Sequence, residues 1–228
     1  MPEARQVTAE DGQVVVPPRA VAGQPPGMGH ALRLVPSRTA IVIIDVQRYF
    51  LDTPPFAAMR ETVRPIANFL PAAREAGITV VHLRTEFLPD LVDVGRLGSR
   101  TRQMMDGTGA ALVRGAPLTD GPAELAPAES DIVVTKTRFS GFWGSRLNDV
   151  LRARNIDSLI LTGGTTTVCV ESTLRDAVFL EYNGVVFSDC ARDITPELHE
   201  AALERIDLFF GWVCDSAEFS AALRMDAQ

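Results

Sequence analysis

Short runs of β-branched and aliphatic residues alternate with longer amphipathic stretches along most of the chain. The runs predict strands, and the stretches between them predict helices. The predicted strands are residues 39–45, 77–83, 132–135, 158–162, 184–188 and 212–214, and the predicted helices are residues 58–76, 143–154, 167–182 and 196–208. Apolar strands that alternate with helices are typical of a parallel sheet covered on both faces, so the fold class is α/β.

The first 38 residues do not follow this pattern. They are rich in Pro, Gly and Ala, and they predict an irregular N-terminal arm, 1–38, with one short strand at Val14–Val16. Such an arm often lies across a neighbouring subunit. Because a chain of 228 residues with 46% hydrophobic composition fits one large α/β domain, residues 39–228 are predicted to form a single domain.

Residues 86–130 are too long for an ordinary connection between two elements of such a domain. Long loops in compact domains are commonly functional. The segment contains four arginines that are candidates for binding an anionic substrate, namely Arg96, Arg100, Arg102 and Arg114.

Charge and cysteine content narrow the class of protein. The net charge is -7 and the arginines are scattered, which predicts no nucleic-acid partner. No stretch approaches the roughly 18 to 20 apolar residues of a membrane span, and the start lacks the pattern of a signal peptide. Three widely spaced cysteines suit a reducing compartment. We therefore expect a soluble, cytoplasmic protein that acts on a small molecule without a membrane partner.

The only lysine of the chain, Lys136, ends the predicted third strand, although the chain has 22 Lys and Arg residues in all. Arginine is locked in its charged state, whereas an ammonium is a compact charge that can also give up a proton. Lys136 is therefore a candidate functional residue, and composition alone leaves chance retention equally open.

Two more strand ends carry reactive groups, at the edge of a parallel sheet where ligands bind. Asp45 follows the first strand and is a candidate general base, although an Asp there can also cap a turn. Cys169 follows the fourth strand, in the first turn of a predicted helix. The helix N-terminus and Lys136 would both lower the pKa of its thiol. Cys190 and Cys214 are interpreted as small buried residues, which is the usual role of an apolar-flanked cysteine.

These three residues together meet the needs of covalent acyl transfer: a nucleophile, a carboxylate that accepts and returns its proton, and a cation. The turn Gly163–Thr165 adds backbone N–H groups that, with that of Cys169, could bind an oxyanion.

Aromatic and polar residues near the motifs are candidates for a substrate pocket. The candidates are Gln47, Tyr49, Phe50, Phe142 and Trp143. Aromatic residues are more often part of the core. Arg138, Glu171 and Arg175 are further polar groups near the motifs, and the pair Glu171 and Arg175, four residues apart on one helix, is expected to form an ion pair.

Three segments, AIVIIDVQRYF, VTKTRFSGFWGSRL and LTGGTTTVCVESTLRDA, resemble the isochorismatase-like cysteine hydrolase family over roughly residues 39–215. The resemblance implies a three-layer Rossmann-like fold with a six-stranded, mainly parallel sheet in the order 3-2-1-4-5-6. It implies a triad of Asp45, Lys136 and Cys169, and a cis peptide bond between Gly164 and Thr165. The oxyanion would then bind the N–H groups of Thr165 and Cys169. The family also implies a homo-oligomer, either a dimer or a tetramer.

Differences from some branches of the family narrow the expected chemistry. Nicotinamidases carry a histidine-containing metal site soon after the first motif, where this chain has no histidine, so we expect no catalytic metal and no cofactor. The segment CVESTLRDA is more similar to amide and ureido C–N hydrolases, such as N-carbamoylsarcosine amidohydrolase, ureidoacrylate amidohydrolase, biuret hydrolase and streptothricin hydrolase.

Three alternatives stay open at this point. The segment QRYF also resembles true isochorismatases, which cleave a vinyl ether and typically lack the cysteine. A non-catalytic family member would keep the fold without the chemistry. A dinucleotide-dependent oxidoreductase is disfavoured because no GxGxxG turn follows the first strand.

Overall fold

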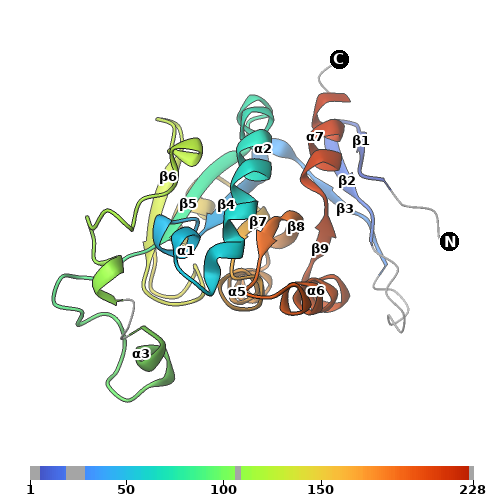
Figure 1. Cartoon of the computed structure of the whole chain (residues 1–228). Helices are drawn as coiled ribbons and strands as arrows, with labels where there is room; N and C mark the ends of the chain where they lie inside the picture. Colours follow the sequence, from blue (N-terminus) through green and yellow to red (C-terminus); the bar gives the residue numbers. More distant parts are fainter. Residues whose placement is uncertain (1–5, 19–28, 106–108, 226–228) are drawn as a thin grey trace.

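A six-stranded sheet forms the centre of the molecule (Figure 1). The computed structural model describes residues 6–18, 29–105 and 109–225. The strands are β4 (Thr39–Ile44), β5 (Thr79–Thr85), β6 (Ile132–Lys136), β7 (Ser158–Gly164), β8 (Asn183–Arg192) and β9 (Trp212–Cys214). Their order is β6-β5-β4-β7-β8-β9, and each neighbouring pair is parallel. This is the order that the family resemblance implied, and the Rossmann-like α/β fold class is confirmed.

The central strand β4 separates two hydrophobic cores. All six of its residues are buried, because its two edges are paired and both faces are covered. Ile41 and Ile43 point into one core, while Ala40, Val42 and Ile44 point into the other. The alternation of side chains along a strand therefore explains why β4, which is buried on both faces, is apolar at every position after Thr39.

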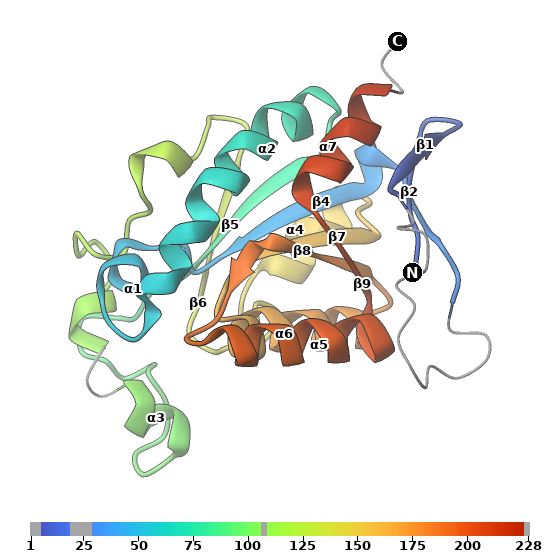
Figure 2. The ribbon, with the colours of Figure 1, turned by 45° about the vertical axis from the view of Figure 1, so that its right-hand side comes forward.

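Helices cover both faces of the sheet (Figure 2). The helices α2 (Val63–Glu75) and α7 (Ser216–Met225) lie on one face, while α4 (Leu147–Ala153), α5 (Glu171–Phe179) and α6 (Pro196–Arg205) lie on the other. All four predicted helices are present, but three continue into tighter or wider turns. A 3-10 helix, Phe56–Thr62, precedes α2, and π-helical turns, Thr166–Val170 and Ile206–Phe210, precede α5 and follow α6. The sequence did not predict α7.

Part of the predicted N-terminal arm is regular. The strands β1 (Thr8–Glu10), β2 (Gln13–Val16) and β3 (Leu32–Leu34) form an antiparallel sheet, where the sequence predicted an irregular segment with one short strand. The strands are stable because their apolar side chains join the same core as α7. Residues 1–5 and 19–28 of the arm lie outside the described residues, and the domain boundary at residue 38 stays a prediction.

The long segment between β5 and β6 leaves the body of the protein. It contains α3 (Arg100–Met105) and two 3-10 helices, Gly109–Leu112 and Ala123–Leu125. In Figures 1 and 2, α3 lies well away from the sheet. A small third core attaches the base of the segment to α1 (Arg48–Asp52), and its buried members are Tyr49, Phe87, Val94 and Leu112.

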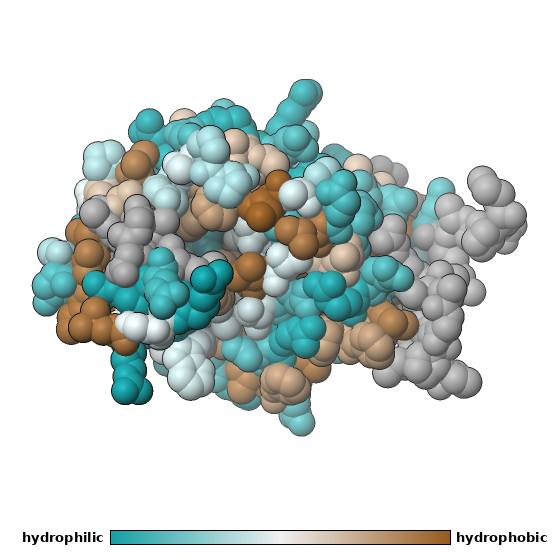
Figure 3. All heavy atoms as spheres, turned by 60° about the horizontal axis from the view of Figure 1, so that its bottom comes forward, coloured by the Kyte–Doolittle hydropathy of each residue, from teal (hydrophilic) through white to brown (hydrophobic). Residues whose placement is uncertain are grey.

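Apolar side chains do not gather into one patch on the face shown in Figure 3, where brown residues are dispersed among teal ones. The exposed large apolar residues include Phe179, Phe209, Leu97 and Trp143, which come from different parts of the chain. None of the helices in the described ranges has the length and apolar character needed to cross a membrane. The expected homo-oligomer stays a prediction.

Candidate active site

Four neighbouring strands bring one functional side chain each to the same edge of the sheet. Asp45 follows β4, Thr85 ends β5 and Lys136 ends β6. Cys169 lies in the π-helical turn that follows β7. Because β6, β5, β4 and β7 are adjacent and parallel, their carboxyl ends converge. The structure thus brings together the three residues that the sequence singled out, and it adds Thr85.

Lys136 lies at the centre of this cluster. Its side chain is 1% exposed, and Nζ lies 2.8 Å from Oδ2 of Asp45 and 2.9 Å from Oγ1 of Thr85. The same nitrogen is 3.0 Å from the carbonyl oxygen of Arg138 and 3.7 Å from Sγ of Cys169. Burial lowers the pKa of this ammonium, but Asp45 and Cys169 outweigh burial and raise it overall. Lys136 is therefore a fixed positive charge at neutral pH.

The carboxylate of Asp45 has two different oxygens. Oδ1 accepts a hydrogen bond of 2.8 Å from the hydroxyl of Thr85. Oδ2 is fully enclosed and faces the ammonium group of Lys136 at 2.8 Å. The backbone of Asp45 is in the left-handed region, at φ 55°, which is uncommon for a residue other than glycine. The carboxylate is thus held between a neutral hydroxyl on one oxygen and an ammonium group on the other.

The thiol of Cys169 is the third member of the cluster. Burial raises its pKa to about 12; Lys136 pulls the pKa down and Asp45 pushes it up. The sequence predicted a lowered thiol pKa, and this prediction is wrong because desolvation exceeds the effect of Lys136. The cysteine therefore rests as a neutral thiol, and a base must take its proton before it can act as a nucleophile.

Two buried side chains hold the turn that carries Cys169. The carboxylate of Asp193 accepts hydrogen bonds from the backbone N–H and the hydroxyl of Thr167, at 2.6 and 2.7 Å. His199 has Nδ1 2.9 Å from the Thr166 hydroxyl. These contacts tie the nucleophile turn to α6 and to the end of β8, and so limit the movement of Cys169.

The turn between β7 and Cys169 depends on glycine. Gly163 has φ 97°, and a Cβ atom there would lie 2.0 Å from the carbonyl oxygen of Ile44. Only glycine fits at this approach of β7 to β4. The peptide bond between Gly164 and Thr165 is cis, as the family resemblance implied. Thr165 is buried beside the start of the turn, and binding of an oxyanion by its N–H stays a prediction.

Gln47 is used within the protein. It is fully buried, and its side-chain N–H groups donate to the carbonyl oxygens of Thr85 and Thr119, at 3.0 and 2.9 Å. Its Oε1 accepts a hydrogen bond of 2.8 Å from the backbone N–H of Thr85. Both amide hydrogens are therefore engaged, so the contacts of Gln47 indicate a structural role beside the site. Its predicted contact with substrate stays untested.

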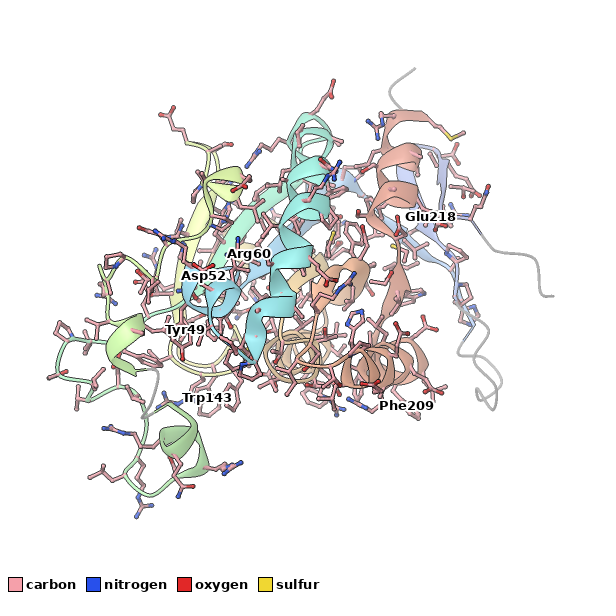
Figure 4. All side chains as sticks on the ribbon, in the orientation of Figure 1. Tyr49, Asp52, Arg60, Trp143, Phe209 and Glu218 are labelled. Atoms are coloured by element: carbon pink, nitrogen blue, oxygen red, sulfur yellow. The ribbon has the colours of Figure 1, made fainter. Side chains whose placement is uncertain are left out.

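The candidate aromatic residues occupy different environments. Tyr49 is buried, with Phe50 packed edge-on against it at 5.1 Å. Phe142 stacks on Tyr182 at 5.7 Å in the core beneath α5. Trp143 is 68% exposed. Tyr49 and Trp143 appear on the same side of the molecule in Figure 4, away from Phe209 and Glu218. The three packed rings are thus held by core contacts, and Trp143 remains the aromatic candidate most open to a ligand.

Glu171 forms the expected ion pair with Arg175, at 2.6 Å, and a second with Arg205, at 2.8 Å. Both arginines lower the pKa of this buried carboxyl against the effect of burial. Cys190 and Cys214 are buried free thiols whose pKa values are raised by burial, which agrees with their interpretation as small buried residues.

The arginines of the long segment make local contacts. Arg114 lies 3.6 Å from Glu86, and Arg102 donates to the carbonyl oxygen of Leu91. The segment is linked to the site through Arg138, which donates to the carbonyl oxygen of Asp93 at 2.8 Å. Delivery of a cation to substrate by this segment stays a prediction. In the described part of the chain, no three His, Cys, Asp or Glu side chains are grouped to hold a metal ion.

Known proteins resemble this chain in both sequence and fold. A model of the isochorismatase domain matches residues 39–218. The ureidoacrylate amidohydrolase RutB of Cronobacter sakazakii (strain ATCC BAA-894) is 37% identical over 216 residues, which cover 86% of this chain and 93% of that protein. The enzyme of the same name from Rhizobium rhizogenes (strain K84 / ATCC BAA-868) is 35% identical over 221 residues, which cover 89% of this chain and 90% of that protein.

Two solved structures extend the comparison. A cysteine hydrolase from Pseudomonas syringae pv. phaseolicola 1448A superposes with a TM-score of 0.76 at 31% identity, covering 85% of this chain and 95% of the other. The N-carbamoylsarcosine amidase of Thermoplasma acidophilum superposes with a TM-score of 0.62 at 26% identity, covering 78% of this chain and 96% of the other.

Proposed function

This chain belongs to the isochorismatase family, and from that premise we propose that it is a cysteine-dependent hydrolase of a C–N bond in a small amide, ureide or carbamoyl compound. The relatives named ureidoacrylate amidohydrolase and N-carbamoylsarcosine amidase support this class of substrate. The observation that carries the proposal is the buried cluster in which one ammonium contacts both a carboxylate and a thiol. The vinyl-ether branch of the family typically lacks a cysteine in this position, so its presence here favours C–N hydrolysis.

The first half of the proposed reaction forms a covalent intermediate. Asp45 takes the thiol proton of Cys169, and the thiolate attacks the substrate carbonyl carbon. The N–H groups of Thr165 and Cys169 hold the negative oxygen of the tetrahedral intermediate. The C–N bond then breaks, and the nitrogen leaves as ammonia or an amine with the proton held by Asp45. A thioester on Cys169 remains.

The second half reverses the proton transfers with water as the nucleophile. Asp45 accepts a proton from the attacking water, and the oxygen adds to the thioester carbon. Collapse of this intermediate breaks the C–S bond, and the Asp45 proton returns to the sulfur. Lys136 stays protonated throughout, so it offsets whichever of the two groups is negative. The raised thiol pKa supports a role for Asp45 as the base, because a neutral thiol is a poor nucleophile.

The test is ammonia release from a panel of ureidoacrylate, N-carbamoyl amino acids and simple primary amides, with isochorismate assayed alongside. We expect release from at least one C–N substrate and its loss in Cys169→Ala. Cys190→Ala is a matched control, because this cysteine is buried away from the cluster in the first core. Turnover of isochorismate alone, retained in Cys169→Ala, would contradict the proposal.

A further inference from the structure

Thr85 occupies the position between the two charged groups of the site. It ends β5, the strand between β4 and β6, and it is 4% exposed. Its hydroxyl oxygen lies 2.8 Å from Oδ1 of Asp45 and 2.9 Å from Nζ of Lys136.

The direction of these two hydrogen bonds is fixed by chemistry. An ammonium group can only donate, so the hydroxyl oxygen of Thr85 must accept from Lys136. A hydroxyl has one proton, and that proton is then directed to Oδ1 of Asp45. Oδ1 consequently accepts from the Thr85 hydroxyl, while Oδ2 faces the ammonium group of Lys136.

Thr85 is held in this position from behind by Gln47. The side-chain amide of Gln47 pairs with both the N–H and the carbonyl oxygen of the Thr85 backbone, as a neighbouring strand would. A third hydrogen bond, to the carbonyl oxygen of Thr119, fixes the amide itself. The hydroxyl of Thr85 therefore has little freedom to turn away from Asp45.

We propose that Thr85 is a positioning residue that, held by Gln47, keeps the Asp45 carboxylate oriented beside Lys136 and Cys169 and stabilises its ionised form. This inference rests on the proposed function, in which Asp45 is the base. A hydrogen bond to the charged form of a carboxylate stabilises that form. Loss of the Thr85 hydroxyl should therefore move the acid limb of any reaction that needs ionised Asp45 to higher pH.

The experiment measures the rate of iodoacetamide alkylation of Cys169 against pH in the wild type, Thr85→Val and Thr85→Ser. It needs no substrate, so it can be interpreted even if the panel of C–N compounds is not turned over. The titratable groups that face Asp45 are Lys136 from β6 and Cys169 from the turn after β7. Cys169→Ala provides the background from the two buried cysteines.

We expect the acid limb of Thr85→Val to lie about one pH unit or more above that of the wild type. The limb of Thr85→Ser, which keeps the hydroxyl, should coincide with the wild type. Thr39→Val is the matched control, since Thr39 is a fully buried threonine with one hydrogen bond at the opposite end of β4. Where a C–N substrate is found, kcat should fall in Thr85→Val while KM changes little.

A Thr85→Val profile that superposes on the wild type would overturn the proposal, and so would an equal shift in Thr39→Val. If Thr85→Val does not fold, Thr85→Ala removes the same hydroxyl with less steric change and is subject to the same two criteria. A shift with normal folding but no turnover of any C–N compound would support the role of Thr85 and contradict the proposed substrate class.

Discussion

Substitution of Lys136 by methionine removes the positive charge from the site and keeps a side chain of similar length. Lys136 and Asp45 are each 1% exposed, and their charged atoms are 2.8 Å apart. Breaking a buried pair by removing one partner costs about 3–5 kcal/mol, because the remaining charge is left without compensation. A typical domain is stable by about 5–15 kcal/mol, so this single change should remove a large fraction of the free energy of unfolding.

The double substitution Lys136→Met with Asp45→Asn isolates the cause of that loss. Since the double variant buries no unpaired charge, it should be less destabilised than the sum of the two single variants. We expect a coupling free energy of about 2 kcal/mol or more between the two positions.

The assay is urea unfolding at neutral pH, followed by circular dichroism, for the wild type, the two single variants and the double variant. Arg33→Met is the matched control. Arg33 pairs with Glu10 at 2.6 Å, but both side chains are about half exposed, so its loss should cost less than about 1 kcal/mol. The reasoning is refuted if Lys136→Met costs no more than Arg33→Met, or if the single effects simply add.

Three further predictions concern activity, backbone geometry and pH. Lys136→Arg should lower kcat by about 100-fold or more, because a guanidinium group cannot keep the same contacts without displacing a reacting group. Near-normal turnover of the best C–N substrate by this variant would refute the prediction. Gly163→Ala should lower the melting temperature more than Gly77→Ala. Both glycines have a positive φ, but only at Gly163 would a Cβ atom collide with the backbone of a neighbouring strand. Equal decreases in melting temperature would refute this steric argument. Burial lowers the pKa values of His82 and His199, so the unfolded chain binds more protons and stability should fall as pH drops below about 6.5. Unfolding measured against pH should show a weaker decline for His82→Gln and for His199→Gln.

The sheet and most of the cluster could be predicted from the sequence, because the signals are local. Apolar runs indicate strands. Asp45, Lys136 and Cys169 each lie at or after the end of such a run, which places them at the same edge of a parallel sheet. Thr85 was missed because the predicted second strand ended at residue 83, two residues early. The strand order itself contained the signal, since the strand between the first and the third must end between Asp45 and Lys136.

Other features depend on packing that no local pattern records. The raised pKa of Cys169 comes first from burial, which arises from elements distant in the chain. The strands β1 to β3 have three or four residues each, and they are stabilised by contact with α7 rather than by their own propensity. Gln47 has a polar side chain of the kind that binds substrates. Its partners within the protein could be identified only once β5 and the segment at Thr119 were placed beside it.

The central position of β4 also has a consequence for biosynthesis. β4 pairs with β5 along one edge and with β7 along the other. β5 is synthesised soon after β4, but β7 is synthesised only after β5 and β6. Until Ser158 and the residues after it leave the ribosome, a mostly apolar strand has an unpaired edge, which is a template for association between chains. We therefore expect truncations between β6 and β7 to aggregate, and the growing chain to be a substrate for chaperones until β7 completes the sheet.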